Sequence, residues 1–164
     1  MPKPHTDNLL EILVHRAKTT PDKRAFVFLE DGELKESALT YAELDRRSRS
    51  IAAELQARGL QGERALLLYP PGLDFVTAFY ACAYAGVIAV PAYPPDPNRI
   101  DRTLPRVQAI VDDCSASCVL TTSNIKAMAT FLFPQGNSLA QLDWFASDEL
   151  HNQDPALWKK PKST

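Results

Sequence analysis

The sequence predicts an α/β domain, in which a mostly parallel sheet is flanked by helices and accompanied by a small β-hairpin. Two patterns indicate this class. From residue 64 onward, short unbroken apolar runs alternate with segments of helical length, which is typical of strands buried on both faces of a parallel sheet. Before residue 64, two amphipathic segments flank a pair of extended runs separated by Asp31-Gly32. Three successive strand–helix–strand units imply right-handed crossovers.

Length and composition favour a single domain and exclude several classes of partner. The chain has 164 residues, 45% of them hydrophobic, which is enough for one core. Because 18 basic residues nearly balance 20 acidic ones, no electrostatic feature favours a nucleic-acid or anionic-membrane partner. No apolar run approaches the roughly 20 residues of a membrane span, and the MPKPHTDN start lacks a signal core. With three cysteines, an odd number, we expect reduced thiols and a cytoplasmic location.

The first predicted helix begins after Asn8, which is spaced as a cap before an apolar stripe, and closes at Pro21. The next stretch, AFVFLEDGELKESALT, predicts a hairpin in which Asp31-Gly32 supplies the positive φ angles of a tight turn. The apolar stripe of the helix comprises Leu9, Leu10, Leu13, Val14 and Ala17.

A second helix is predicted between Thr40 and Gly59. Thr40 and Glu43 have the spacing of a capping box, and Gly59 is placed to end the helix in a left-handed conformation. The charged residues of this helix fall mostly away from its apolar stripe, so we interpret them as a solvated face rather than a binding patch. They are Asp45, Arg46, Arg47 and Arg49.

The remaining elements are predicted to alternate along the chain, with Gly86 ending one helix just before a strand. Strands are expected at 65–69, 87–92, 117–122 and, more weakly, 144–146, and helices at 73–85, 103–115 and 124–133.

The strand at 87–92 leaves the sheet through a proline-rich exit. Its carboxyl end is where open α/β folds tend to bind ligands. Proline cannot extend a sheet, so Pro94, Pro95 and Pro97 are expected to fix an extended corner. The simpler interpretation is that these prolines only shape a turn, and direct contact with a ligand is the alternative.

We assign no catalytic, cofactor-binding or metal-binding residue from the sequence. The six glycines are scattered, so no glycine-rich phosphate loop is present. Cys114 and Cys118 span a predicted helix end and strand start, which is typical of core or boundary thiols rather than a metal site. No serine lies in a G-x-S-x-G elbow, and no histidine is paired with a nucleophile. Of the histidines, His5 is expected in the terminus, His15 on a solvated helix face and His151 in a polar loop. The acidic pairs Asp112-Asp113 and Asp148-Glu149 are interpreted as solvated carboxylates.

Three stretches taken together resemble a known family. LTYAEL (Leu39 to Leu44) resembles the first core motif of adenylate-forming enzymes, and YACAYAGVIAVPAYPP (Tyr80 to Pro95) resembles their second. The YPPG and PAYPP pairs, with LTT and WFASDEL further on, resemble fatty acyl-AMP ligases, whereas acyl-CoA synthetases tend to lack these pairs. The resemblance extends from the Asn8 helix to Trp158.

The resemblance implies that residues 1–164 are a partial N-terminal AMP-binding-type domain of a longer enzyme, truncated before its phosphate loop. The parent would use ATP and Mg²⁺ to convert a fatty acid into acyl-AMP and pyrophosphate, and then pass the acyl group to an acyl carrier protein. No catalytic residue of the family has a counterpart here, so the chain alone is expected to bind no cofactor and to be an inactive scaffold.

Two other interpretations stay open. One is a free-standing, non-catalytic α/β module that binds a lipid, a carrier protein or a partner subunit. The other is an unrelated α/β enzyme with a dispersed site, which is disfavoured because no activated acid, base or nucleophile can be assembled. If the chain is part of a longer enzyme, apolar surface should lie exposed, with the ATFLF segment and the proline-rich exit as candidates.

Overall fold

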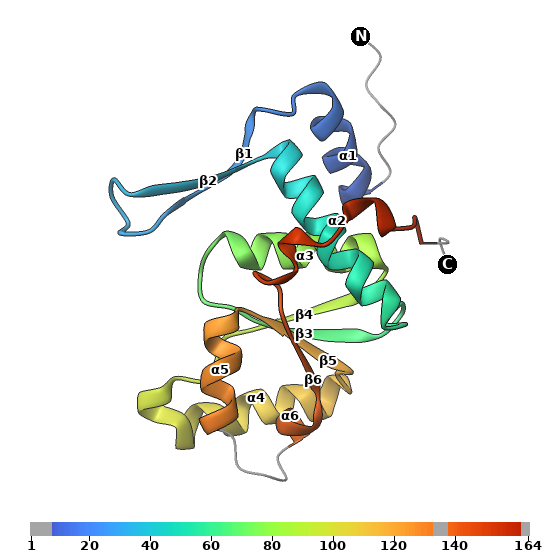
Figure 1. Ribbon diagram of the computed structural model, residues 1–164. Helices are drawn as coiled ribbons and strands as arrows, with labels where there is room; N and C mark the ends of the chain where they lie inside the picture. Colours follow the sequence, from blue (N-terminus) through green and yellow to red (C-terminus); the bar gives the residue numbers. More distant parts are fainter. Residues whose placement is uncertain (1–7, 133–137, 162–164) are drawn as a thin grey trace.

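The computed structural model describes residues 8–132 and 138–161 of the chain. A four-stranded parallel sheet lies at the centre, with helices α2 (Tyr41–Ala57) and α3 (Leu73–Ala85) on one face (Figure 1). Helices α4 (Ile100–Cys114) and α6 (Ser138–Gln141) cover the other face. The predicted fold class is therefore confirmed.

The parallel sheet has the order β4-β3-β5-β6. Strand β3 lies in the middle, pairing with β4 on one side and with β5 on the other, so the predicted strands at 65–69 and 87–92 do share a sheet. The strand at the opposite edge, β6, pairs with β5. The bounds are β3 (Arg64–Leu68), β4 (Ile88–Ala92), β5 (Cys118–Thr121) and β6 (Asp143–Ala146).

Alternation along β3 divides the interior into two cores. Ala65 and Leu67 face the cluster formed with α1 (Leu9–Thr19), α2 and α3. Leu66 and Leu68 face the second cluster, beneath α4 and α6. Because β3 is buried on both faces, its sequence is an unbroken apolar run.

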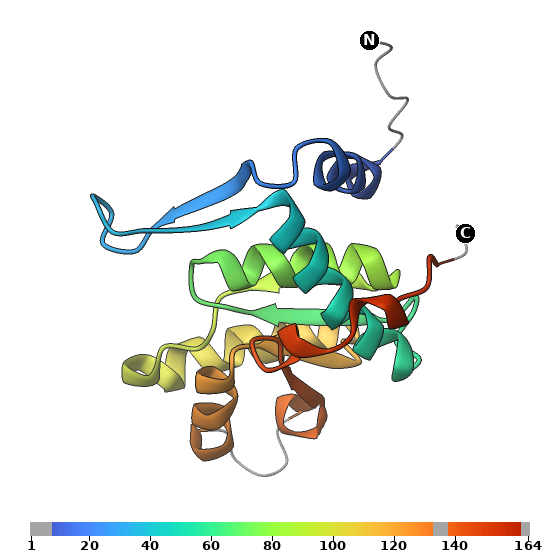
Figure 2. The ribbon, with the colours of Figure 1, turned by 45° about the horizontal axis from the view of Figure 1, so that its top comes forward.

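The predicted hairpin is confirmed, but its turn is not tight. Strands β1 (Arg24–Leu29) and β2 (Glu36–Thr40) pair antiparallel and project from the start of α2 (Figure 2). The six residues between them form a loop in which only Gly32 has positive φ, +78°. The carboxylate of Asp31 accepts from the backbone N–H groups of residues 33, 34 and 35, each at 2.9 Å. These three bonds stabilise a wider loop than Asp-Gly alone predicts.

The predicted ends of the first two helices are confirmed. Asn8 caps α1 by accepting from Glu11 N–H at 2.9 Å, and Thr20 is the C-cap, directly before Pro21. Helix α2 begins with a capping box between Thr40 and Glu43. Just beyond its C-cap, Gly59 takes the left-handed φ of +71°.

Gly86 ends α3 in the left-handed conformation, with φ +72°, as the sequence predicted. It also lies against two other parts of the chain. A Cβ atom at this position would lie 3.2 Å from Gln61 Cγ and 3.4 Å from Pro161 Cβ. Glycine is therefore required here by its backbone angle and by crowding.

Helix α4 begins at Ile100, three residues before the predicted start. A 3-10 helix, Pro97–Arg99, precedes it, and Asp96 caps this turn by accepting from Asn98 N–H at 2.9 Å. The expectation that Pro97 lies in an extended corner was therefore wrong, because proline fits a first helical position, where its missing N–H costs nothing. Pro94 and Pro95 do lie in an irregular segment.

Helix α5 (Ser123–Leu132) agrees with the predicted 124–133, although residue 133 lies outside the described residues. Three further short elements had no sequence prediction: α6 and the 3-10 helices Leu150–Asn152 and Pro155–Leu157. Within the described ranges, no helix is both long and apolar enough to cross a membrane.

Candidate functional site

The carboxyl edge of the sheet gathers the segments that follow its strands, as expected for the ligand-binding edge of an open α/β fold. Three strand ends are tied together there by buried hydrogen bonds. Thr121 Oγ1 donates to the carbonyl oxygen of Leu68 at 2.5 Å, linking β5 to β3. The Tyr69 hydroxyl donates to Ser147 Oγ at 2.8 Å, and Ser147 Oγ donates to the Thr121 carbonyl oxygen at 3.2 Å.

This network makes the edge a rigid wall rather than a source of acid–base chemistry. Tyr69 is 4% exposed, and Thr121 and Ser147 are fully buried. Burial raises the pKa of the Tyr69 phenol well above its usual value, so the hydroxyl stays protonated and acts as a hydrogen-bond donor. Its role is to hold the end of β6 against the end of β3.

Two apolar hollows lie at this edge and share Pro70, Pro71 and Tyr93. The first has a volume of about 350 Å³ and extends toward Phe75 and Arg106. The second, of about 260 Å³, lies between the proline-rich exit and α5, with Met128 on its wall. The exit thus forms the walls of two hollows as well as a corner. Direct ligand contact by these prolines stays a prediction.

Two of the four acidic residues considered as cation ligands have other partners, while Asp113 and Glu149 are exposed, as predicted. Both oxygens of Asp148 accept from Ser123, one from its N–H at 2.8 Å and the other from its hydroxyl at 2.6 Å. Asp148 therefore caps α5, and its interpretation as a solvated carboxylate was wrong. Asp112 Oδ1 accepts from Gln108 and from Ser138. In the described part of the chain, no group of three His, Cys, Asp or Glu residues is placed to share a metal ion.

The cysteines occupy the positions that their spacing predicted, with Cys114 at the end of α4 and Cys118 at the start of β5. All three are free, and Cys82 and Cys118 are buried. Burial raises the pKa of Cys118 to about 12 and also raises that of Cys82. These two thiols stay protonated at neutral pH, which makes them poor nucleophiles and poor metal ligands.

The histidines are not brought together with any nucleophile. His15 is exposed on α1, as predicted, and His5 lies outside the described residues. His151 lies in a 3-10 helix against α2 rather than in a polar loop. Burial, followed by the charge of Arg47, lowers the pKa of His151, so it is neutral at physiological pH.

The sequence did not predict the way in which residues 147–161 cross α2 on their way from β6 toward α1 (Figures 1 and 2). Side chains along α2 bind the backbone of this segment. Ser50 Oγ donates to the carbonyl oxygen of Gln153 at 2.8 Å. The Gln56 amide donates to the Lys159 carbonyl oxygen at 2.7 Å and accepts from its N–H at 3.0 Å. Helix α2 therefore fixes the path of the 147–161 segment over several turns.

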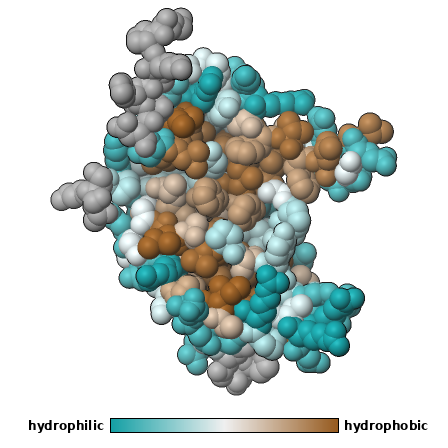
Figure 3. All heavy atoms as spheres, turned by 180° about the vertical axis from the view of Figure 1, so that it is seen from behind, coloured by the Kyte–Doolittle hydropathy of each residue, from teal (hydrophilic) through white to brown (hydrophobic). Residues whose placement is uncertain are grey.

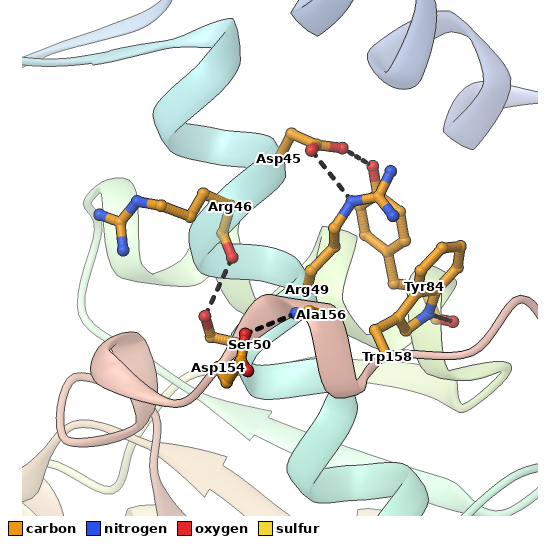
Figure 4. A network of polar contacts seen from close by, with 8 residues as sticks. All are labelled: Asp45, Arg46, Arg49, Ser50, Tyr84, Asp154, Ala156 and Trp158. Carbon is orange, nitrogen blue, oxygen red and sulfur yellow. Dashed lines mark hydrogen bonds and ion pairs between the residues drawn. The ribbon is translucent and has the colours of Figure 1, made fainter.

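Trp158 anchors the segment through a cluster of charged and aromatic side chains (Figure 4). Its indole N–H donates to the Tyr84 carbonyl oxygen at 2.7 Å, and the two rings meet edge to face with centroids 5.1 Å apart. The Arg49 guanidinium lies 4.3 Å from the Trp158 ring centroid and 4.9 Å from that of Tyr84. Such cation–π contacts are strongest when they are partly shielded from water, as here.

Asp45 completes this cluster, which we call the Trp158 anchor: Asp45, Arg49, Tyr84 and Trp158. Asp45 accepts from Arg49 Nε at 3.0 Å and from the Tyr84 hydroxyl (Figure 4). Burial and then this carboxylate raise the pKa of Tyr84, which stays protonated. The sequence interpretation of Asp45 and Arg49 as a solvated face was therefore wrong. The i,i+4 spacing of the two residues was visible in the sequence, but their contact with a tryptophan about 110 positions later was not.

Comparisons with known proteins show the family of the chain. The model of the AMP-binding enzyme family matches residues 13–162. The chain is 41% identical to the medium-chain-fatty-acid–[acyl-carrier-protein] ligase JamA of Moorena producens, over 98% of this chain and 27% of that protein. It is also 39% identical to human Disco-interacting protein 2 homolog A, over 71% of this chain and 8% of that protein.

A solved structure of a ligase also resembles this chain. The fatty acyl-adenylate ligase from L. pneumophila, in complex with acyl adenylate and pyrophosphate, superimposes with a TM-score of 0.81 at 31% identity. The match covers 96% of this chain and 26% of that one. The chain thus spans about a quarter of the length of these ligases. Because the family model matches nearly the whole sequence, the chain belongs to the AMP-binding enzyme family of adenylate-forming ligases.

Proposed function

We propose that this chain is the N-terminal part of a cytoplasmic fatty acyl-AMP ligase. The complete enzyme uses ATP to convert a fatty acid into acyl-AMP and pyrophosphate, and it transfers the acyl group to an acyl carrier protein. The single observation that carries the proposal is the 41% identity to a fatty-acid–carrier-protein ligase over 98% of this chain. We propose no nucleic-acid partner for the enzyme, because basic and acidic residues nearly balance in this chain.

The role of residues 1–164 in this enzyme is positioning. Adenylation requires phosphates and Mg²⁺ to be held, and the carboxylate to be aligned for attack on the α-phosphate. The carboxyl-edge hydrogen bonds and the Trp158 anchor hold β6 and the 147–161 segment in fixed places. No described residue cluster fits a metal ion, and the glycines form no phosphate cradle, so we derive no catalytic step through ATP or Mg²⁺ on this chain.

Exchange of labelled pyrophosphate into ATP tests this proposal, run with fatty acids of 8 to 16 carbons on the 164-residue chain and on its longer parent. We expect fatty-acid-dependent exchange by the parent and none by the chain alone, because the phosphate-holding elements are supplied elsewhere. Turnover by the chain above an enzyme-free blank would reveal an unrecognised nucleotide site. A parent that forms acyl-CoA as readily as acyl-AMP would instead be an acyl-CoA synthetase.

A second candidate is a free-standing, non-catalytic module for a lipid, a carrier protein or a partner subunit. The apolar hollow of about 350 Å³ beside Tyr93 and Arg106 favours it, because such a hollow fits part of an acyl chain. Genomic sequence beyond Thr164 separates the two candidates. An open reading frame that continues into a Ser/Thr/Gly-rich loop would eliminate the free-standing module.

A further inference from the structure

A row of aromatic rings runs from the hairpin along the outward side of α3 to the carboxyl edge of the sheet. Successive ring centroids are 6.3 Å apart for Phe26 and Tyr80, 6.2 Å for Tyr80 and Phe79, 6.4 Å for Phe79 and Phe75, and 6.3 Å for Phe75 and Tyr69. We call Phe26, Tyr80, Phe79 and Phe75 the aromatic face; Tyr69, at the inner end of the row, is buried. Seen from behind, hydrophobic residues gather across the middle and upper part of the molecule, whereas its lower end is hydrophilic (Figure 3).

The aromatic face is only partly covered by the described residues. Phe26 is 37% exposed and Phe79 is 36% exposed, and the strand that follows α3 leaves Ile88 49% exposed. Contiguous apolar surface of this kind is rare on a monomer and marks an interaction site. Single exposed hydrophobic residues need no explanation, but a connected row does.

Helix α3 has the composition of a helix that is buried all round. Its inward side includes the small residues Ala78, Ala81 and Cys82, together with the fully buried Tyr84, and packs in the core with α2 and the sheet. Its outward side carries the aromatic residues Phe75, Phe79 and Tyr80, and the only charged residue in the helix is Asp74, in the first turn. A helix that is apolar on every side belongs in the interior of a larger assembly.

The edge strand beside α3 is a poor template for strand addition. Ile88 N–H donates inward, to the carbonyl oxygen of Glu63 at 2.8 Å. By alternation, Ala89 and Pro91 turn their backbone nitrogen atoms outward, and proline has no N–H to donate. A covering partner therefore packs against this side through apolar side chains rather than by extending the sheet.

The length of the related ligases indicates what the partner is. Roughly three quarters of the JamA ligase and of the L. pneumophila ligase lies outside the part that matches this chain. We propose that the aromatic face is the surface on which the remainder of the enzyme chain docks, through an apolar, uncharged patch of its own. This inference rests on the proposed function, because it takes the chain to be the N-terminal part of a longer ligase.

Thiol labelling at position 79 tests this docking surface. Cys114, and every cysteine of the longer enzyme outside residues 1–164, are first replaced by serine, leaving Cys82 and Cys118, which are buried. Phe79→Cys is then made in the longer enzyme and in the 164-residue chain. The matched control is Ala109→Cys, an exposed position on α4, on the opposite face of the sheet. In the longer enzyme we expect the thiol at 79 to react at least about tenfold more slowly than the thiol at 109, because it is covered.

In the isolated chain the two thiols should react within about threefold of each other, because both positions are exposed there. Equal rates at the two positions in the longer enzyme would overturn the proposal, and this comparison does not require the isolated chain to fold. A second copy of the chain would be the partner if the thiol at 79 reacted fast in the longer enzyme but more slowly in the isolated chain as the protein concentration rose. That result would also overturn the proposal.

The outcome is independent of the exchange assay. A longer enzyme that activates no fatty acid but protects position 79 would keep the docking surface and remove the proposed function. A longer enzyme that is active on fatty acids, with position 79 as reactive as position 109, would do the reverse.

Discussion

Helices α2 and α3 lie side by side on the same face of the sheet, yet their outward sides have opposite character (Figure 1). Helix α2 presents hydroxyl and amide side chains to the 147–161 segment, which lies across the helix through hydrogen bonds to its backbone. Helix α3 turns aromatic rings outward, and Phe79 stays 36% exposed. Residues 147–161 therefore cover the polar side of this helix pair, whereas the described residues leave the aromatic side partly exposed.

The largest loss of stability is expected for a substitution at the interface between α2 and α3. Ile51 on α2 is fully buried in the core that includes α3. Ile51→Ala removes buried apolar volume and leaves a cavity, so we expect a loss of about 2–5 kcal/mol in the free energy of unfolding. Denaturant unfolding followed by circular dichroism measures it. A loss below about 1 kcal/mol would mean that α2 and α3 do not pack as a single unit.

The end of α3 gives the next largest effect. Gly86→Val forces a β-branched residue to φ +72° and places its Cβ atom 3.2 Å from Gln61 Cγ. We expect a cost of about 1–3 kcal/mol, seen as a lower melting temperature. Gly59→Val is the matched control, because Gly59 has φ +71° but open space around its Cβ position. An unchanged melting temperature for Gly86→Val would contradict the left-handed turn.

A substitution in the Trp158 anchor tests how strongly α2 holds the 147–161 segment. Tyr84→Phe removes the hydroxyl that donates to Asp45 and leaves the Asp45–Arg49 ion pair in place. A hydrogen bond to a charged group contributes about 1.5 kcal/mol, and we expect a destabilisation of this size. Hydrogen exchange at residues 155–160 should accelerate at the same time. Destabilisation without faster exchange there would show that Tyr84 stabilises α3 alone.

A smaller, pH-dependent effect is expected at His151, which covers α2 near Arg46 and Arg47 and faces Asp74 and Asp148. Its folded-state pKa lies below the ordinary value of 6.5, so below that value the unfolded chain binds more protons than the folded chain. Stability should therefore be complete above about pH 7.5, fall as the pH drops through 6.5, and level off below the folded-state pKa. His151→Asn should flatten this part of the profile, measured as melting temperature against pH.

The smallest effect is expected on the outward face of α2 itself. Glu54 and Arg58 form an ion pair at 2.9 Å, with the arginine side chain 56% exposed. Glu54→Gln should change the free energy of unfolding by less than about 0.5 kcal/mol, because solvent screens exposed pairs. A loss above 1 kcal/mol would place this pair in an interface, and the polar side of the molecule would then resemble the aromatic one.

The predicted exposure of apolar surface is confirmed in part, and other apolar residues are exposed at positions that were not predicted. In the ATFLF segment, Phe131 is 89% exposed, while Phe133 lies outside the described residues. At the proline-rich exit, Tyr93 is 73% exposed. The aromatic face was not predicted, because the outward and inward sides of α3 are equally apolar in the sequence. No amphipathic pattern distinguishes them, and only the packing of the small residues against α2 shows which side is covered.

The sequence by itself determined the features that depend on neighbouring residues. The capping box of Thr40 and Glu43, the left-handed glycines 59 and 86, and the strands around residues 66, 90 and 119 are local patterns of hydrogen bonding and hydrophobic period. The sequence predicted all three strands to be buried on both faces, but the strand around residue 90 lies at the edge of the sheet and has no buried residue. Only the tertiary structure decided that Asp45, Arg49 and Tyr84 meet Trp158, and that Asp148 caps α5. Such contacts join positions far apart in the chain, and their geometry is set by the completed sheet, so no local pattern encodes them.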